Sequence, residues 1–151
     1  MRTLIALTLC LNLNATALWH TSNQQELINA IITVESSGND YAVGDTKSIY
    51  GPAYGPLQIT IGVIADVNSA YKTTFTHKDA FKRKRATVIF RAYVALYATR
   101  KRIGRDVTIR DVALVWHDGS RGWEKGDPSG YWTSVSDALR YNRETRTRMS
   151  R

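Results

Sequence analysis

The chain has 151 residues and is 43% hydrophobic, which is enough for one domain with a sizeable core and too short for two ordinary domains. Its formal net charge of +8 favours a polyanionic partner, such as nucleic acid or an acidic bacterial cell wall. The sequence contains no nucleic-acid-binding motif, zinc-ligand spacing or phosphate loop. We therefore expect a cell-wall partner, no specific nucleic acid, no metal and no cofactor.

The first 17 residues have the pattern of a secretory signal peptide. Arg2 is a short positive region, residues 4–13 are largely apolar, and residues 15–17 form a small-x-small cleavage site. We expect cleavage, export to the periplasm or the medium, and no stable membrane insertion afterwards. The alternative is a retained weak anchor, because the apolar stretch is short for a membrane span. The single cysteine, Cys10, lies in this segment, so the mature chain would carry a net charge of +7 and no disulfide.

The first predicted helix, residues 22–36, carries a glutamate on an apolar face. Its apolar positions on that face are Ile28, Ile31 and Ile32. Glu35 follows at helical spacing, and Gly38 is a signal for the helix to end. Burial among apolar side chains and the negative end of the helix dipole both raise the pKa of a carboxyl group. The pattern therefore predicts a general acid at Glu35, the alternative being a solvated glutamate on the last turn.

The next segment, residues 38–58, holds four glycines and two prolines, which favours turns over helix. Short extended pieces at 41–43 and 57–59 are expected to form a small antiparallel hairpin or an irregular lobe. A short helix is predicted over 61–70.

Three more helices are predicted in the second half of the chain. One is expected over 76–101, one from the Thr108 capping box through Trp116, and one around 131–142. The positions expected to face the core in these helices are Val88, Ile89, Ala92, Leu96, Ile109, Val112, Ala113, Trp116, Tyr131, Val135, Ala138 and Leu139. The basic tail, 143–151, is expected to be frayed. The predicted fold is α+β and predominantly α: one helical domain over 18–142 with a small loop or β-hairpin lobe.

Three short motifs follow one another along this domain. They are Glu35-Ser36, Gly55-Pro56-Leu57-Gln58-Ile59 and Trp116-His117-Asp118-Gly119. In this order and spacing they resemble the lysozyme superfamily over roughly residues 22–140, and most of all invertebrate-type lysozymes and soluble lytic transglycosylase-like domains. The resemblance implies a lysozyme-like fold and a monomeric enzyme that cleaves peptidoglycan. Invertebrate-type lysozymes are rich in disulfides, so this cysteine-poor chain fits a bacterial or phage origin better than an animal one.

The resemblance also implies roles for residues near the acid. Asp45 would be the second catalytic carboxylate, although an ordinary turn-forming aspartate fits the same position equally well. Ser36 would hold the substrate's acetamido group or orient the acid, or else bond only its own helix backbone. Gln58 and Tyr54 would line the sugar cleft, with Gly55 letting the backbone approach the glycan.

The aromatic residues of the second half carry further implied roles. Related families place tyrosine-asparagine or aromatic-asparagine where this chain has Trp116-His117, and the transglycosylase tyrosine bonds the catalytic glutamate. Both residues are expected in the cleft, the alternative for His117 being a polar residue at a helix end. Trp116 can donate only from its indole nitrogen, so the tyrosine's hydrogen bond does not carry over directly. Trp123, Tyr131 and Trp132 would stack on sugar rings or pack in the core.

The resemblance implies cleavage of the β-1,4 bond between N-acetylmuramic acid and N-acetylglucosamine. We expect lysozyme-type hydrolysis, because residues 42–59, which form the expected small lobe, resemble the invertebrate-type pattern and because Trp116 replaces the transglycosylase tyrosine. The alternatives are a lytic transglycosylase, which leaves 1,6-anhydro ends, and a wall-binding module without turnover.

Overall fold

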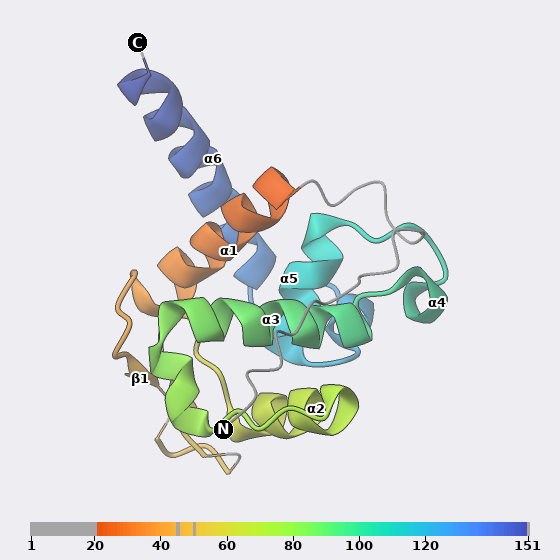
Figure 1. The fold of residues 1–151 in the computed structure, drawn as a ribbon. Helices are drawn as coiled ribbons and strands as arrows, with labels where there is room; N and C mark the ends of the chain where they lie inside the picture. The colour runs from red at the N-terminus through yellow and green to blue at the C-terminus, as the bar shows by residue number, and fades with distance from the viewer. Residues whose placement is uncertain (1–20, 45, 50, 151) are drawn as a thin grey trace.

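A computed structural model describes residues 21–44, 46–49 and 51–150, so the predicted signal segment lies outside the described residues. The predicted fold class is confirmed: the chain is mainly helical with one two-stranded antiparallel sheet. Figure 1 shows the arrangement of these elements. In chain order they are α1 (Thr21–Ser36), β1 (Val43–Gly44), β2 (Ala53–Tyr54), α2 (Ile61–Tyr71), η1 (His77–Phe81), α3 (Arg83–Tyr97), α4 (Arg100–Ile103), α5 (Ile109–Asp118), η2 (Gly122–Glu124) and α6 (Tyr131–Met149).

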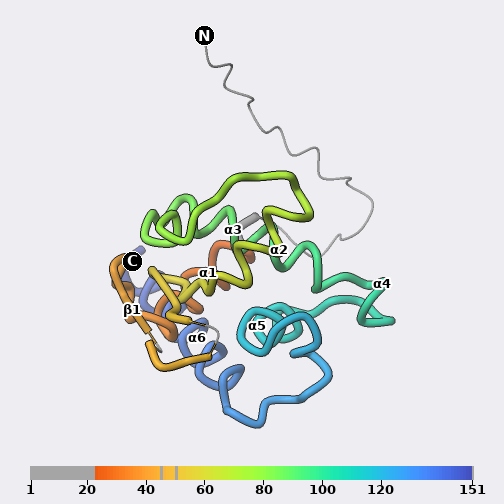
Figure 2. Tube along the Cα trace, turned by 90° about the horizontal axis from the view of Figure 1, so that it is seen from below, coloured from red at the N-terminus to blue at the C-terminus, as the bar shows by residue number. Residues whose placement is uncertain are grey.

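The helix α1 contributes the centre of the hydrophobic core. Ile28, Ile31 and Ile32 are all buried, as predicted from their spacing. In the view of Figure 2, α2 and α3 lie on one side of α1, and α5 and the start of α6 lie on the other. Helix α1 packs mainly on α6, and α5 contacts both of them. The C-terminal end of α1 therefore lies where three helices meet.

The small lobe differs in register from the expected hairpin. Val43 pairs with Tyr54 and Gly44 with Ala53, so the second strand comes earlier than the predicted 57–59 piece. Ile59 forms only a single bridge, to Tyr54. Gly55 has a φ of +77°, and a Cβ atom there would lie 1.9 Å from the carbonyl oxygen of Ala80. This glycine allows the lobe to pack closely on η1, and its expected role in letting the backbone approach a glycan stays a prediction.

The prediction of a single helix over 76–101 is wrong, because the structure divides this stretch into η1, α3 and α4. The first break has a local cause. The carboxylate of Asp79 accepts hydrogen bonds from the backbone N–H and the hydroxyl of Thr76, which forms a capping box and starts a separate turn. Lys82 then adopts an extended conformation before α3 begins. Of the predicted stripe, Ile89 is buried but Val88 is 46% exposed, because Ala86, Phe90 and Tyr93 face the core instead.

The start of α5 is confirmed. The hydroxyl oxygen of Thr108 accepts a hydrogen bond from the backbone N–H of Asp111, and the carboxylate of Asp111 accepts one from the backbone N–H of Thr108. Arg105 also donates two hydrogen bonds to the buried Asp111 carboxylate, at 2.7 and 2.8 Å. These hydrogen bonds form a strong local cap that fixes the start of α5, the helix whose last two residues are His117 and Asp118.

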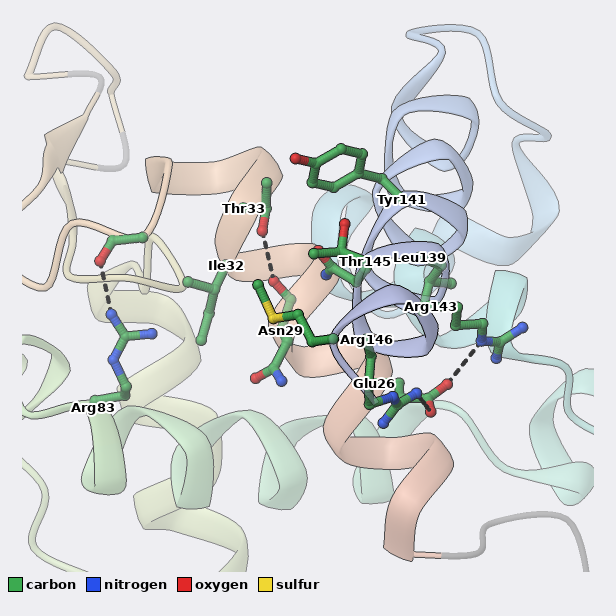
Figure 3. A pocket seen from close by; sticks show the side chains of 13 residues that line it. Glu26, Asn29, Ile32, Thr33, Arg83, Leu139, Tyr141, Arg143, Thr145 and Arg146 are labelled. Atoms are coloured by element: carbon green, nitrogen blue, oxygen red, sulfur yellow. Dashed lines mark hydrogen bonds and ion pairs between the residues drawn. The ribbon is translucent and has the colours of Figure 1, made fainter. Parts of the chain in front are cut away.

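The prediction of a frayed C-terminal tail is also wrong, because α6 continues to Met149. Arg143 donates a hydrogen bond to Glu26 of α1 at 2.8 Å, and Arg146 binds the other oxygen of the same carboxylate (Figure 3). These contacts hold the basic end of α6 along α1 as an ordered helix. In the part of the chain that the structure describes, no helix combines the length and apolar character needed to cross a bilayer.

Candidate functional site

Glu35 lies on the last turn of α1, with its side chain 16% exposed. The helix ends as Gly38 predicts: Ser37 and Gly38 have positive φ angles of 52° and 85°. Their backbone N–H groups donate to the carbonyls of Thr33 and Ile32, at 3.0 and 3.3 Å. These hydrogen bonds satisfy the last carbonyls of the helix and fix the turn from which Glu35 projects.

The hydroxyl of Tyr131 donates a hydrogen bond of 2.7 Å to Oε1 of Glu35. Tyr131 is the first residue of α6 and is 6% exposed. The carboxylate of Asp127 accepts hydrogen bonds from the backbone N–H groups of Trp132 and Thr133, at 2.9 and 3.2 Å, and so caps this helix. The cap holds Tyr131 in place, and burial together with the nearby Glu35 raises the pKa of its hydroxyl.

Burial raises the pKa of Glu35 from 4.5 to about 7, although the hydrogen bond from Tyr131 lowers it in part. The cause is the loss of hydration around the charged form. Among the described residues, His117 is the basic side chain that comes within 4.0 Å of this carboxyl group. A carboxyl group in this state can donate a proton near neutral pH, as a general acid must.

His117 completes the cluster from the end of α5. Its Nδ1 lies 4.0 Å from Oε1 of Glu35, and its side chain is 37% exposed. Its ring stacks on the ring of Tyr131, with a centroid distance of 4.0 Å and an interplanar angle of 10°. The structure thus brings together one acid, one phenol and one imidazole from three helices.

Ser36 connects α1 to the small lobe, and Gln58 makes a hydrogen bond within the lobe. The hydroxyl of Ser36 lies 2.9 Å from the carbonyl oxygen of Pro56 and 3.0 Å from that of Ile32, and these two acceptors share its hydrogen. The side-chain amide of Gln58 donates to the carbonyl of Gly55 at 2.9 Å. Both predicted substrate-binding residues therefore make structural hydrogen bonds next to Glu35's turn.

The predicted aromatic residues lie in different environments. Trp116 is 7% exposed and packs in the core against Phe90, at a centroid distance of 4.7 Å, and against Tyr93 at 5.8 Å. It has no free face for a sugar ring. Tyr54 stacks on His77 at 4.1 Å and on Phe81 at 4.8 Å.

Trp123 and Trp132 are half-buried at the edge of the core. Both residues are partly exposed, so contact with a ligand stays a prediction for each.

Asp45, the predicted second carboxylate, lies outside the described residues. Asp118 is the other carboxylate at this end of α5, and its Oδ2 atom is buried without a hydrogen-bond partner. It raises the pKa of Tyr131 through its charge. Within the described residues, no cluster of three or more histidine, cysteine or acidic side chains is suited to hold a metal ion.

The pocket in Figure 3 is a separate feature, with a volume of about 500 Å³. It lies between the Asn29 and Thr33 face of α1 and the C-terminal half of α6, where Tyr141 and Thr145 contribute to its lining. Glu35, Tyr131 and His117 do not line this pocket. These three residues are therefore identified as a candidate site by their chemistry, and not because they line a large cavity.

The contact between Tyr131 and Glu35 joins residues 96 positions apart, and no local sequence pattern predicts it. The sequence leaves in doubt whether the acid has a tyrosine-like partner at Trp116, and in the structure Tyr131 of α6 supplies this hydrogen bond instead. Compared with known proteins, the sequence matches no protein-family model and no curated protein.

Proposed function

We propose that this chain is a glycosidase that cleaves the β-1,4 bond between N-acetylmuramic acid and N-acetylglucosamine in peptidoglycan. The observation that carries the proposal is Glu35, a largely buried carboxyl group with a pKa of about 7 that accepts a hydrogen bond from Tyr131. The three motifs that resemble the lysozyme superfamily supply the substrate class. Export to the bacterial envelope, and the attraction of a basic chain to an acidic wall, belong to the same proposal.

In the proposed reaction, Glu35 donates its proton to the glycosidic oxygen as the bond to the sugar carbon breaks. Positive charge develops at that carbon, and a nucleophile then attacks it. The carboxylate left at Glu35 is stabilised by the hydroxyl of Tyr131, because a hydrogen bond to a charged acceptor is stronger than one to a neutral acceptor. The same carboxylate can then accept the proton of the nucleophile.

The nature of the nucleophile defines two candidate reactions. Hydrolysis uses water, and the resemblance of the small lobe to invertebrate-type lysozymes favours it. Intramolecular transglycosylation uses the 6-hydroxyl of the muramic acid itself and needs only one catalytic carboxylate. The bond from Tyr131 to Glu35 favours this second candidate, because it reproduces the tyrosine–glutamate contact of lytic transglycosylases.

The test uses a suspension of bacterial wall, with turbidity and soluble products measured together. We expect wild type to clear the suspension and Glu35→Gln to lose at least about a hundredfold in rate, because glutamine cannot donate the proton. Glu26→Gln is a matched control on the same helix and should clear the wall at the wild-type rate. Equal clearing by wild type and Glu35→Gln contradicts the proposal, as does wall binding without release of soluble fragments.

Mass spectrometry of the released fragments separates the two reactions. Reducing muramic ends identify hydrolysis, and 1,6-anhydro ends identify transglycosylation. Asp45→Asn adds a second measurement: a loss of turnover supports the two-carboxylate hydrolase, and unchanged turnover supports the single-acid reaction.

A further inference from the structure

His117 occupies the solvent side of the site. Its side chain is 37% exposed, whereas that of Glu35 is 16% exposed. It is held there by stacking flat on the ring of Tyr131, at 4.0 Å between centroids. The imidazole is therefore fixed in orientation by the same residue that bonds the acid.

Two groups face the same carboxyl oxygen of Glu35. The hydroxyl of Tyr131 lies 2.7 Å from Oε1, and Nδ1 of His117 lies 4.0 Å from that atom. A neutral carboxyl group carries one hydrogen on one oxygen, and the other oxygen is the better acceptor of hydrogen bonds. Tyr131 donates to Oε1, and a hydrogen on Nδ1 of His117 would add positive potential at the same atom, so the acidic hydrogen is most stable on Oε2.

We infer that His117 is a positioning residue for the acid: together with Tyr131 it keeps the transferable hydrogen of Glu35 on Oε2. The inference rests on the proposed function and gives His117 a role through Glu35 instead of the substrate contact expected from its motif. At 4.0 Å the interaction is electrostatic, since this distance exceeds that of a hydrogen bond. In the tautomer that carries its hydrogen on Nδ1, His117 would favour negative charge on Oε1, and the Glu35 titration described below tests this effect.

Other charged or titratable groups surround this end of α5. They are Glu35 from α1, Tyr131 from α6, Asp118 on α5 itself, and Arg121, Glu124 and Lys125 from the η2 segment. Arg121 pairs with Glu124, and Lys125 bonds the backbone carbonyl of Asp118 at 3.2 Å. The charged groups of the η2 segment thus have their own partners, which leaves the carboxylates of Glu35 and Asp118, and of these two Glu35 comes within 4.0 Å of His117.

Two substitutions distinguish the effect of the stacked ring of His117 from the effect of its Nδ1 atom. His117→Phe keeps an aromatic ring on Tyr131 and removes Nδ1, whereas His117→Gln keeps an N–H donor and removes the ring. Carboxyl ¹³C NMR follows the titration of Glu35 in each variant without any need for activity. We expect His117→Phe to move the Glu35 midpoint upward by about half a pH unit or more, because a group that favours the carboxylate is lost. His117→Gln should move it less.

Kinetics on soluble wall fragments give the second readout. A positioning role predicts that His117→Phe lowers kcat about tenfold and leaves KM within about twofold, because the acid is misdirected while binding is intact. The inference is overturned if KM rises while kcat is unchanged. It is also overturned if the Glu35 midpoint does not move in His117→Phe, or moves equally in both variants.

Comparing the two readouts separates the role of His117 from the proposed function. Coupling here means that the Glu35 midpoint moves in His117→Phe and moves less in His117→Gln. Coupling without wall cleavage would refute the proposed function alone. Cleavage without coupling would refute the role of His117 alone.

Discussion

Helix α1 carries two glutamates whose environments drive them to opposite protonation states. The side chains of Glu26 and Glu35 are exposed to nearly the same extent, 18% and 16%. Hydrogen bonds from Arg146 and Arg143 lower the pKa of Glu26, whereas burial raises that of Glu35 to about 7. The difference is that two guanidinium groups stabilise the charge of Glu26, whereas the hydrogen bond from Tyr131 only partly offsets the lost hydration of Glu35.

The comparison shows that one helix can use the same residue type for structure and for chemistry. At Glu26 the charged form is satisfied, and the carboxylate joins α1 to the end of α6. At Glu35 the charged form is only partly satisfied by Tyr131, so the neutral acid persists to higher pH. We expect the folded structure to be locally least stable around Glu35, where the proposed chemistry takes place.

The largest expected effect is a gain of stability in Glu35→Gln at high pH. The folded state keeps a proton on Glu35 up to about pH 7 that the unfolded chain releases near its ordinary value of 4.5. The wild type is therefore most stable below 4.5 and loses stability as pH rises to about 7. We expect the variant to be more stable by about 2 to 3 kcal/mol at pH 8 and by little at pH 4, measured by denaturant unfolding. An equal difference at both pH values would contradict the assignment.

The same substitution at Glu26 is expected to have the opposite sign. The lowered pKa means that the Glu26 carboxylate stabilises the fold above its ordinary value of 4.5 and that this contribution is lost as pH falls. Arg143 and Arg146 are 54% and 64% exposed, so solvent weakens the pairs. Glu26→Gln should cost about 1 kcal/mol at neutral pH and low salt, and less in high salt. A gain of stability at neutral pH would break the comparison.

The smallest expected effect concerns Tyr131→Phe. Its hydroxyl lowers the pKa of Glu35, so removing it should raise that pKa further. The alkaline limb of kcat/KM on wall fragments should then move upward by about half a pH unit to one unit. A downward movement would show that Tyr131 favours the neutral form of the acid instead.

The sequence predicts features whose causes are local. The apolar face of α1, the stop at Gly38 and the capping box of Thr108 with Asp111 all follow from neighbouring residues. The break at Asp79 has a capping box of the same kind, with Thr76 three residues earlier, so the printed sequence does contain its signal.

Contacts between residues far apart in the sequence could not be predicted in this way. The bond from Tyr131 to Glu35 and the pairing of Arg143 with Glu26 span 96 and 117 residues, and nothing in the local sequence encodes them. The first completes the candidate site, and the second orders the end of α6. Both depend on how α6 packs on α1, which is known only from the fold.

The most direct test of the account is a carboxyl ¹³C NMR titration of the wild-type protein, in which both glutamates are followed at once. We predict a midpoint of about 7 for Glu35 and a midpoint below 4.5 for Glu26. This result would establish an acid that is protonated near neutral pH beside an ionised structural carboxylate on the same helix. A Glu35 midpoint near 4.5 would contradict the account, because Glu35 would then be ionised at the pH where it is proposed to donate a proton.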